Sequence, residues 1–397
     1  MKRPRVAAAE SATMPASSSH VVLKTSNQFR TRLVCSVLSL HPVVMTGIRE
    51  DEEEPGLNES ELCFARCVAQ ACHGSKLVIN ETGTRITFTP GMLSGGKVVV
   101  DDVHPEVNLG WIVEGFLPLT PFFKVPLRLE LVGGLTDEEG EVGINHLRNV
   151  SLKLLQKFTG EAGLLECHTR GFAPDAGGAI TLTCPTVRKH LQIPTDLDSS
   201  DLRVLKIRGT AQASRVNPQL ANRLATASRS KLEEFATDVF INTDCRSSRT
   251  KDCGASPGYS LSVWAEFVDP KQLKEKHVDL VRSITVLGAS GCYSTISKET
   301  PEALAMRVSN LLLDQIAHRG CVDTMDQTLL LLLMACCPEQ IIKANVGKTL
   351  APHAVQALRV IKQFLGVKFH LAVNPETELV HVSCLGNGVG NIARNVT

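Results

Sequence analysis

Residues 319–335 of the chain read R-G-C-V-D-T-M-D-Q-T-L-L-L-L-L-M-A, in which a small polar cluster precedes a run of five leucines. Such an apolar run is typical of a fully buried segment, and at this length periodicity alone does not separate helix from strand. Asp and Thr are good helix caps, so we interpret Asp323 or Thr324 as the start of a buried helix. With Asp326 and Gln327, the same cluster also has the composition of a functional site. The rest of the chain has to distinguish a cap from a site.

Length and composition set the broad class. The chain has 397 residues, more than single cores usually reach, so we expect two or more structural units. Its net charge is +1, so any basic surface has to be local. No apolar run reaches the roughly 18–20 residues of a membrane span, and the first residues lack a secretory apolar segment. Thirteen cysteines without the spacing of a disulfide framework favour a reducing, intracellular compartment.

One order of elements recurs along the chain: a helix, a strand, a turn and a second strand. The three copies are predicted at 58–72, 76–79 and 84–90; at 143–158, 163–169 and 179–184; and at 353–365, 367–373 and 379–385. A further helix is predicted ahead of each copy, at 27–40, 108–123 and 323–334, with strands at 43–48 and 126–132 after the first two. This order predicts a repeated α/β module in which two helices cover each sheet.

One block interrupts the series and forms a small α/β insert. It contains predicted strands at 204–215, 238–245 and 259–268 and a helix at 217–235, with Pro218 in its first turn. We therefore divide the chain into a disordered tail (1–20), a large domain holding the first two modules (21–186), the insert (187–285) and the third module (286–397). The tail contains K-R-P-R, for which a nuclear address is the alternative to a solvated segment.

The insert also has the one local charge imbalance. Between Arg203 and Lys251 there are ten basic and four acidic residues. Such a patch suits phosphate contacts, and a solvated face or a protein-binding surface remains an equal alternative. The candidate contacts in this block are Lys206, Arg208, Arg215, Arg246, Arg249 and Lys251. The glycine-rich loop 171–178, beside Arg170, is either an anion cradle or a tight connection between two strands.

No metal or covalent-catalysis site follows from spacing. Cys63, Cys67, Cys72 and His73 match no zinc pattern, and Cys63 and Cys67 fall one turn apart on a predicted amphipathic helix. We expect no metal, no cofactor and no catalytic residue.

Several short motifs together resemble one known family. They are Ser26-Asn27-x-Phe29-Arg30-x-Arg32-Leu33-Val34, Pro55-Gly56-Leu57, Thr82-Gly83-Thr84, Pro90-Gly91-x-Leu93-x-Gly95-Gly96, Arg170-Gly171-x-x-Pro174-x-x-Gly177-Gly178, Lys206-Ile207-Arg208-Gly209, Arg215-Val216-x-Pro218-Gln219-x-Ala221-Asn222-Arg223, Ser256-Pro257-Gly258, and Gly320-Cys321-Val322-Asp323 with Gln327. On these motifs, nearly the whole chain after residue 20 resembles the RNA 3′-terminal phosphate cyclase family, and most closely its non-catalytic eukaryotic branch. The resemblance implies an α/β fold with a large domain of three repeated βαβαββ modules and a small inserted α/β domain.

Three departures from the cyclases imply that the nucleotide chemistry is lost. In the enzymes a histidine three residues before an Asp-Gln pair takes AMP from ATP, and here Asp323 stands in that place before Asp326-Gln327. Asn27-Gln28-Phe29 occupies a glycine-rich position near the N-terminus, where the ligand needs close backbone approach. The acidic run 50–54 stands where the enzymes have basic residues.

The resemblance therefore implies a pseudoenzyme of small-subunit ribosome biogenesis in the nucleolus. It implies a role in 18S pre-rRNA processing within the small-subunit processome, a nucleolar GTPase partner, and contact with pre-rRNA or its small nucleolar ribonucleoprotein particle. We expect no membrane partner and no small-molecule substrate. The candidate RNA- or partner-binding residues are Arg30, Arg32, Arg170, Lys206, Arg208, Arg215, Arg246, Arg249 and Lys251. The alternative is a residual enzyme, either a pre-rRNA endonuclease using Asp323 and Asp326 to hold metal or a weak RNA 3′-end-modifying activity.

Overall fold

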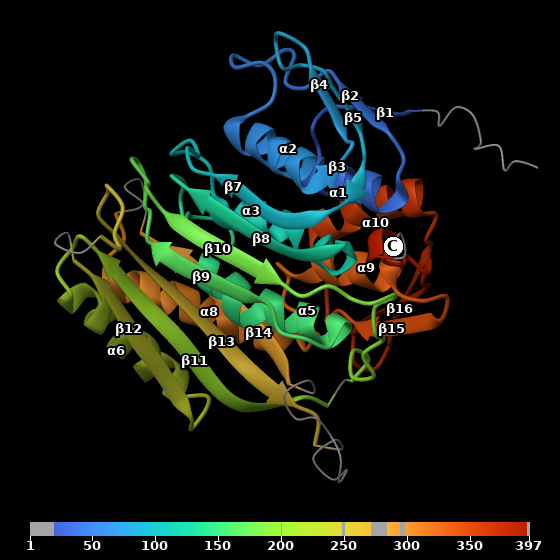
Figure 1. The fold of residues 1–397 in the computed structure, drawn as a ribbon. Coiled ribbons are helices and arrows are strands. Elements are labelled where there is room, and N and C mark those ends of the chain that lie inside the picture. Colours follow the sequence, from blue (N-terminus) through green and yellow to red (C-terminus); the bar gives the residue numbers. More distant parts are fainter. Residues whose placement is uncertain (1–19, 200, 248–250, 271–283, 294–297, 395–397) are drawn as a thin grey trace, which may run out of the picture.

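The computed structural model describes residues 20–199, 201–247, 251–270, 284–293 and 298–394. Figure 1 shows the first module at the top, the second across the middle, the third at the right and the insert at the lower left. The predicted tail, apart from His20, and the charged segment that begins at Lys271 lie outside the described residues. In the described part of the chain, no helix combines the length and the apolar character that crossing a membrane requires.

The first module has six elements in the order βαβαββ, as the family resemblance implies. They are β1 (Val21–Lys24), α1 (Phe29–Ser39), β2 (Val43–Thr46), α2 (Glu59–Ala71), β4 (Lys76–Ile79) and β5 (Ile86–Thr89). The sheet order is β1-β2-β5-β4, with β1 parallel to β2 and β5 antiparallel to both of its neighbours. Helix α2 begins where the sequence predicts it, because Asn58 and Glu61 form a reciprocal capping box.

The second module repeats this order and sheet topology. Its elements are β7 (Gly95–Val100), α3 (Leu109–Phe116), β8 (Val125–Val132), a helix made of α4 (Ile144–His146), the π-helical η2 (Leu147–Ser151) and α5 (Leu152–Thr159), β9 (Leu164–Thr169) and β10 (Ala179–Cys184). The sheet order β7-β8-β10-β9 matches that of the first module position for position. A short antiparallel ribbon pairs β3 (Cys72–His73), which directly follows α2, with β6 (Met92–Leu93), which precedes β7. The 3₁₀ helix η1 (Thr120–Phe122) follows α3.

The third module is split by the insert. Its elements are α9 (Gln327–Cys336), β15 (Ile341–Asn345), α10 (Pro352–Leu365), β16 (Phe369–Val373) and β17 (Val380–Leu385), followed by η4 (Ile392–Arg394). The sheet has three strands in the order β15-β17-β16, which is the order of the other two modules without their first strand. The backbone N–H of Asn345 donates to the carbonyl of Leu197 at 2.8 Å. The segment just before β11, which the sequence division assigns to the insert, therefore lies beside β15, where a first strand would pair.

The insert forms its own sheet and core. Its elements are β11 (Arg203–Ser214), α6 (Gln219–Glu233), β12 (Val239–Arg246), β13 (Gly258–Val268), β14 (Thr285–Cys292) and α8 (Pro301–His318), with the sheet order β12-β11-β13-β14. Apolar side chains of β14 and α8, including Leu287, Leu304 and Val308, belong to the core of this unit. Strand β14 begins at the residue where the sequence places the end of the insert, so we propose that the small domain extends through α8.

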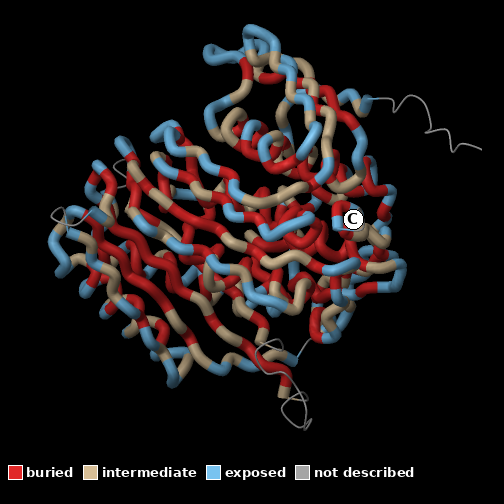
Figure 2. Tube along the Cα trace, in the orientation of Figure 1, coloured by how far each residue is buried: buried red, intermediate tan, exposed pale blue. Residues whose placement is uncertain are grey.

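The leucine run is buried as predicted. Leu329 to Leu333 are each at most 4% exposed and belong to the large core shared by the three modules. Figure 2 shows this core as a continuous buried region beneath exposed loops. Helix α9 thus lies inside the large domain, and the polar residues before it lie where the second module, the third module and the insert meet.

Candidate functional site

The polar cluster before α9 is organised by Asp323. Its Oδ1 accepts hydrogen bonds from the backbone N–H groups of Met325 (3.1 Å) and Asp326 (3.0 Å). Its Oδ2 accepts from the N–H of Gly288 on β14 at 2.9 Å. The predicted start of the helix at Asp323 or Thr324 is therefore wrong by a few residues: α9 begins at Gln327 after the N-cap residue Asp326, and Asp323 instead caps the turn before it.

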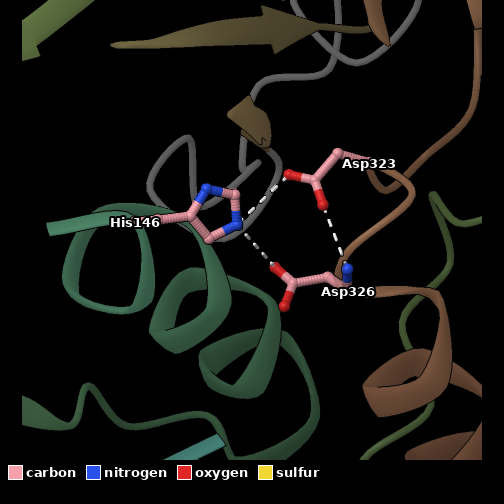
Figure 3. Close-up of side chains that lie close together, drawn as sticks. All are labelled: His146, Asp323 and Asp326. Atoms are coloured by element: carbon pink, nitrogen blue, oxygen red, sulfur yellow. Dashed lines mark hydrogen bonds and ion pairs between the residues drawn. The ribbon is translucent and has the colours of Figure 1, made fainter. Parts of the chain in front are cut away.

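A buried histidine from the second module faces this cluster. His146 Nε2 lies 3.5 Å from Asp323 Oδ2 and 3.9 Å from Asp326 Oδ2 (Figure 3). The Ser151 hydroxyl donates to the other oxygen of Asp326 at 2.7 Å. Burial, followed by the charge of Asp323, raises the pKa of Asp326 well above its usual value, and the Ser151 hydrogen bond opposes this. Sequence reasoning missed His146, because no motif connects it to a segment in another module.

Gln327 holds the start of α9 against the segment that precedes α10. Its amide nitrogen donates to the carbonyls of Val346 (3.2 Å) and Thr349 (3.0 Å), and its oxygen accepts from the N–H of Ala351 at 2.7 Å. Every polar atom of this side chain is thus engaged with the backbone, so Gln327 has a structural role here.

A polar cavity of about 530 Å³ lies next to the cluster and includes Met325 and Thr328 in its lining. Its cations are paired: Arg30 lies 2.8 Å from Glu114, and Arg49 forms an ion pair with Glu61. The Arg30 guanidinium also lies over the Trp111 ring, 4.4 Å from its centroid.

A third carboxylate in the cavity, Glu141, has no such partner in the lining. Its burial raises its pKa; the charges of Glu114 and Glu138 add to this rise and that of Arg30 opposes it. The cavity therefore has no surplus of positive charge for a polyphosphate.

The N-terminal wall of the cavity keeps a glycine-like backbone while carrying side chains. Gln28, the residue before α1, has φ +59°, in the left-handed region that glycine adopts most easily. Its side chain accepts from the Thr31 hydroxyl at 3.1 Å and donates to Gln356 at 3.2 Å. Phe29 is 3% exposed and forms part of the core. The side chains of Gln28 and Phe29 therefore fill the space that glycines would leave open to a ligand, in agreement with the interpretation from the sequence.

Comparison with known proteins assigns the family. A model of the family described as RNA 3′-terminal phosphate cyclase matches residues 22–371. The chain belongs to the RNA 3′-terminal phosphate cyclase family. A probable RNA 3′-terminal phosphate cyclase-like protein of Dictyostelium discoideum is 35% identical over 93% of this chain and 98% of that protein. The RNA 3′-terminal phosphate cyclase-like protein of Homo sapiens is 34% identical over 93% of this chain and 96% of its own length. An rRNA processing protein of Schizosaccharomyces pombe is 34% identical over 92% of this chain and 95% of its own length.

In this cyclase-family chain, Arg170 is not a surface residue. It is 2% exposed, donates to Asn145 at 2.8 Å, and lies 3.4 Å from Asp137 and 3.7 Å from Asp244 of β12. As the protein is folded here, its guanidinium cannot reach an RNA phosphate. A Cβ at Gly171 would lie 2.5 Å from the Gly134 carbonyl, so a glycine is needed there for close backbone packing. These contacts favour the tight-connection interpretation of the 171–178 loop.

The other basic candidates lie in separate places. Arg32 is on α1, Lys206 and Arg208 stand near the start of β11, and Arg215 and Arg246 lie together at the far end of the insert sheet, where the N–H of Arg215 donates to the Arg246 carbonyl at 3.1 Å. Arg32 donates to the carbonyl of Thr25 at 2.7 Å, Arg215 to that of Gly254 at 2.8 Å, and Arg246 to that of His168 at 2.8 Å. On the insert, Lys206 pairs with Glu266 at 3.1 Å and Arg208 with Asp238 at 2.8 Å. Lys251 is exposed, and Arg249 lies outside the described residues.

The cysteine cluster of α2 behaves as part of the core. Cys67 and Cys72 are buried, whereas His73 is exposed. Hydrogen bonding to Cys67 lowers the pKa of Cys63, and the same bond together with burial raises the pKa of Cys67. Among the described residues, the group whose ligand atoms lie close enough for a metal ion is a different one: His146, Asp323 and Asp326.

Proposed function

We propose that this member of the cyclase family is a non-catalytic factor in small-subunit (18S) pre-rRNA processing. It would act in the nucleolus as part of the small-subunit processome and bind a nucleolar GTPase together with pre-rRNA or its ribonucleoprotein particle. Similarity to relatives named cyclase-like and to one named an rRNA processing protein supports the rRNA-processing part of the proposal. The observation that carries its non-catalytic part is the state of Asp323.

Asp323 holds the place that a nucleophilic histidine occupies in the cyclases. A carboxylate lacks the imidazole nitrogen that forms a phosphoramidate with AMP. Here both of its oxygens also accept backbone hydrogen bonds, from Gly288, Met325 and Asp326, and the residue is 1% exposed. These contacts support a structural role for Asp323.

The neighbouring cavity supports the same conclusion. Nucleotide polyphosphates are usually held by cations that are free to bind them. The arginines of this cavity, Arg30 and Arg49, are each paired with a glutamate of its wall. A triphosphate would have to displace those glutamates and would then face their charge.

A residual nuclease at Asp323 and Asp326 is disfavoured by access. Both side chains are at most 4% exposed, so a phosphodiester could not reach them without opening the junction between the domains. We therefore do not retain the nuclease as a second candidate function.

RNA or partner contact is better placed on the insert, where Lys206 and Arg208 are partly exposed near the start of β11. Ion pairs near the surface typically contribute about 0–1 kcal/mol, and Lys206 and Arg208 are partly exposed, so they can exchange Glu266 and Asp238 for a phosphate at modest cost. Arg170 is excluded by burial. We propose Lys206 and Arg208 as the contacts. Lys251, which precedes Asp252 beside Arg246, and Arg249, which lies outside the described residues, are further candidates.

The test is capture of pre-rRNA and a GTPase from nucleolar extract by the tagged full-length chain. The wild type should recover both, and the double variant Lys206→Glu with Arg208→Glu should recover clearly less RNA. The matched control is Arg128→Glu. Arg128 also lies on a strand and forms an ion pair with a glutamate, Glu130, at 2.6 Å, but it belongs to the second module. Failure of the wild type to recover pre-rRNA components would contradict the proposed function. An equal RNA loss in the control would contradict the assignment of the surface.

A further inference from the structure

Three potential ligands for a metal ion converge at the junction of the second module, the third module and the insert. His146 comes from α4, and Asp323 and Asp326 come from the turn before α9 (Figure 3). Their nearest ligand atoms all lie within 4.8 Å of one another. The side chains are 2%, 0% and 4% exposed, so bulk water does not solvate these charges.

Two of these atoms have no hydrogen-bond partner among the described residues. They are His146 Nε2 and Asp326 Oδ2, and they face each other at 3.9 Å. Buried polar atoms in folded proteins are nearly always satisfied, so a pair of orphaned atoms aimed at one point calls for a ligand between them. The remaining oxygens are already used: Asp326 Oδ1 accepts from Ser151, and Asp323 Oδ1 accepts from two backbone N–H groups.

The spacing suits a small transition-metal ion. Bonds of about 2.0–2.2 Å in tetrahedral geometry place neighbouring ligand atoms about 3.3–3.6 Å apart. His146 Nε2 lies 3.5 Å from Asp323 Oδ2 and 3.9 Å from Asp326 Oδ2, and all three ligand atoms lie within 4.8 Å of one another, so binding requires the two carboxylates to draw closer together. One imidazole with two carboxylates favours an ion of the Zn²⁺ type over Mg²⁺, which prefers octahedral oxygen ligands and retains several waters.

The charge balance points the same way. Acting as metal ligands, the two carboxylates and a neutral imidazole would carry a charge of −2, which a divalent cation neutralises. Two other buried cations, Lys157 and Arg170, form ion pairs with other carboxylates: Lys157 pairs with Asp196 and Arg170 with Asp137. The only basic group that pairs with Asp323 or Asp326 in the described part of the chain is His146 itself.

The surrounding backbone fixes the ligands in place. The ring of His146 packs directly on Gly288 of β14, where an added Cβ would lie 2.8 Å from Nδ1. The N–H of Gly288 in turn holds Asp323 Oδ2 at 2.9 Å. Strand β14 of the insert thus orients one ligand from each of the two modules.

We propose that His146, Asp323 and Asp326 bind one divalent transition-metal ion of the Zn²⁺ type, which joins the insert to the large domain. This site goes beyond the proposed function in rRNA processing and does not depend on it. Its role is structural, because the ion is enclosed. The sequence gives no motif for it, since the ligands lie on separate modules.

The experiment uses the full-length chain, stripped with a chelator and then reloaded with Zn²⁺ or, in a parallel sample, Co²⁺. We expect one bound ion per chain by elemental analysis and a higher midpoint of thermal unfolding after loading. The Co²⁺ sample should lack the strong near-ultraviolet absorption of thiolate ligands, because no cysteine is a ligand. Asp326→Asn should lower the affinity by about 100-fold or more, since it removes a negatively charged ligand while keeping the side-chain shape.

Ser151→Ala is the matched control. It removes the hydrogen bond to Asp326 Oδ1 and leaves all three ligands, so it should still bind one ion and gain stability on loading. Substoichiometric binding by the wild type, or an unfolding temperature that does not respond to the metal, would overturn the proposal. Thiolate absorption in the Co²⁺ sample or undiminished binding by Asp326→Asn would also overturn it, because the ion would then be elsewhere. The wild-type measurements decide the question even if a variant does not fold.

Discussion

Replacing Arg170 with methionine removes the cation of a buried polar network and keeps most of the volume of the side chain. The guanidinium donates to Asn145 at 2.8 Å and lies 3.4 Å from Asp137, whose Oδ1 accepts from Ser260 of β13 at 3.1 Å. Asp244 of β12 lies 3.7 Å away. Arg170 thus links the second module to two strands of the insert, and its removal leaves Asp137 buried without its cation.

The expected loss of stability is large. Removing one partner of a buried ion pair typically costs about 3–5 kcal/mol, because the remaining charge is uncompensated. For a cooperative unit of about 150–250 residues, 1 kcal/mol corresponds to about 2–4 °C, so the transition should shift down by about 6–20 °C. Arg208→Met is the matched control, since Arg208 pairs with Asp238 at 2.8 Å near the surface and should lose about 1 kcal/mol or less.

Differential scanning calorimetry and urea unfolding measure the effect, with hydrogen exchange reporting on β12 and β13. Because the chain has more than one domain, the transition that contains the insert is the relevant one. The double variant Arg170→Met with Asp137→Asn should recover part of the loss, since it removes the unpaired charge. A change in Arg170→Met no greater than that in Arg208→Met would refute the view that Arg170 is a structural hub.

Three further predictions follow from single side chains. Leu331→Ala, at a fully buried position of α9, should cost about 2–5 kcal/mol in urea unfolding. Its control is Leu311→Ala on α8, where the side chain is 40% exposed and the change should cost less than about 1 kcal/mol. Glu141→Gln should stabilise the protein at pH 7–8 and progressively less toward pH 4.5, as measured by urea unfolding across that range. Burial in the folded state raises the pKa of Glu141 above the unfolded value of 4.5. The protonated carboxyl therefore stabilises the folded state below pH 4.5, and the wild type loses this stabilisation as the pH rises, whereas the glutamine variant does not. Asp323→His should remain unable to form a covalent adenylate with labelled ATP, because the cavity arginines stay paired with glutamates; a labelled band would contradict this account of the cavity.

Local signals in the sequence were sufficient for most of the repeated fold. The helix predicted at 58–72 and the buried segment predicted from the leucine run each correspond to an element of the structure, α2 and α9. Strands β1 and β7 were missed, since they are short or glycine-rich and pair only through partners far along the chain. Strand β14 was missed for the same reason: its place in the insert sheet is set by pairing with β13.

The candidate site was predicted less well, because burial and pairing depend on tertiary structure. Arg170 has the composition of an anion site beside a glycine-rich loop, yet the insert covers it. The basic residues of the insert gave a net positive count in the sequence, but the fold brings Glu266 and Asp238 to two of them. His146 could not be connected to Asp323 by any spacing rule, since the contact exists only once two modules pack together.

The central claim is that the cyclase scaffold is retained while its nucleotide chemistry is absent. The most direct measurement is incubation of the purified full-length chain with α-labelled ATP, a divalent cation and an RNA that ends in a 3′-phosphate, alongside an active cyclase as the positive control. We predict no covalent adenylate on the protein and no conversion of the RNA 3′ end, under conditions in which the control forms both. A labelled protein band that is lost on acid treatment, as a phosphoramidate is, would contradict the claim.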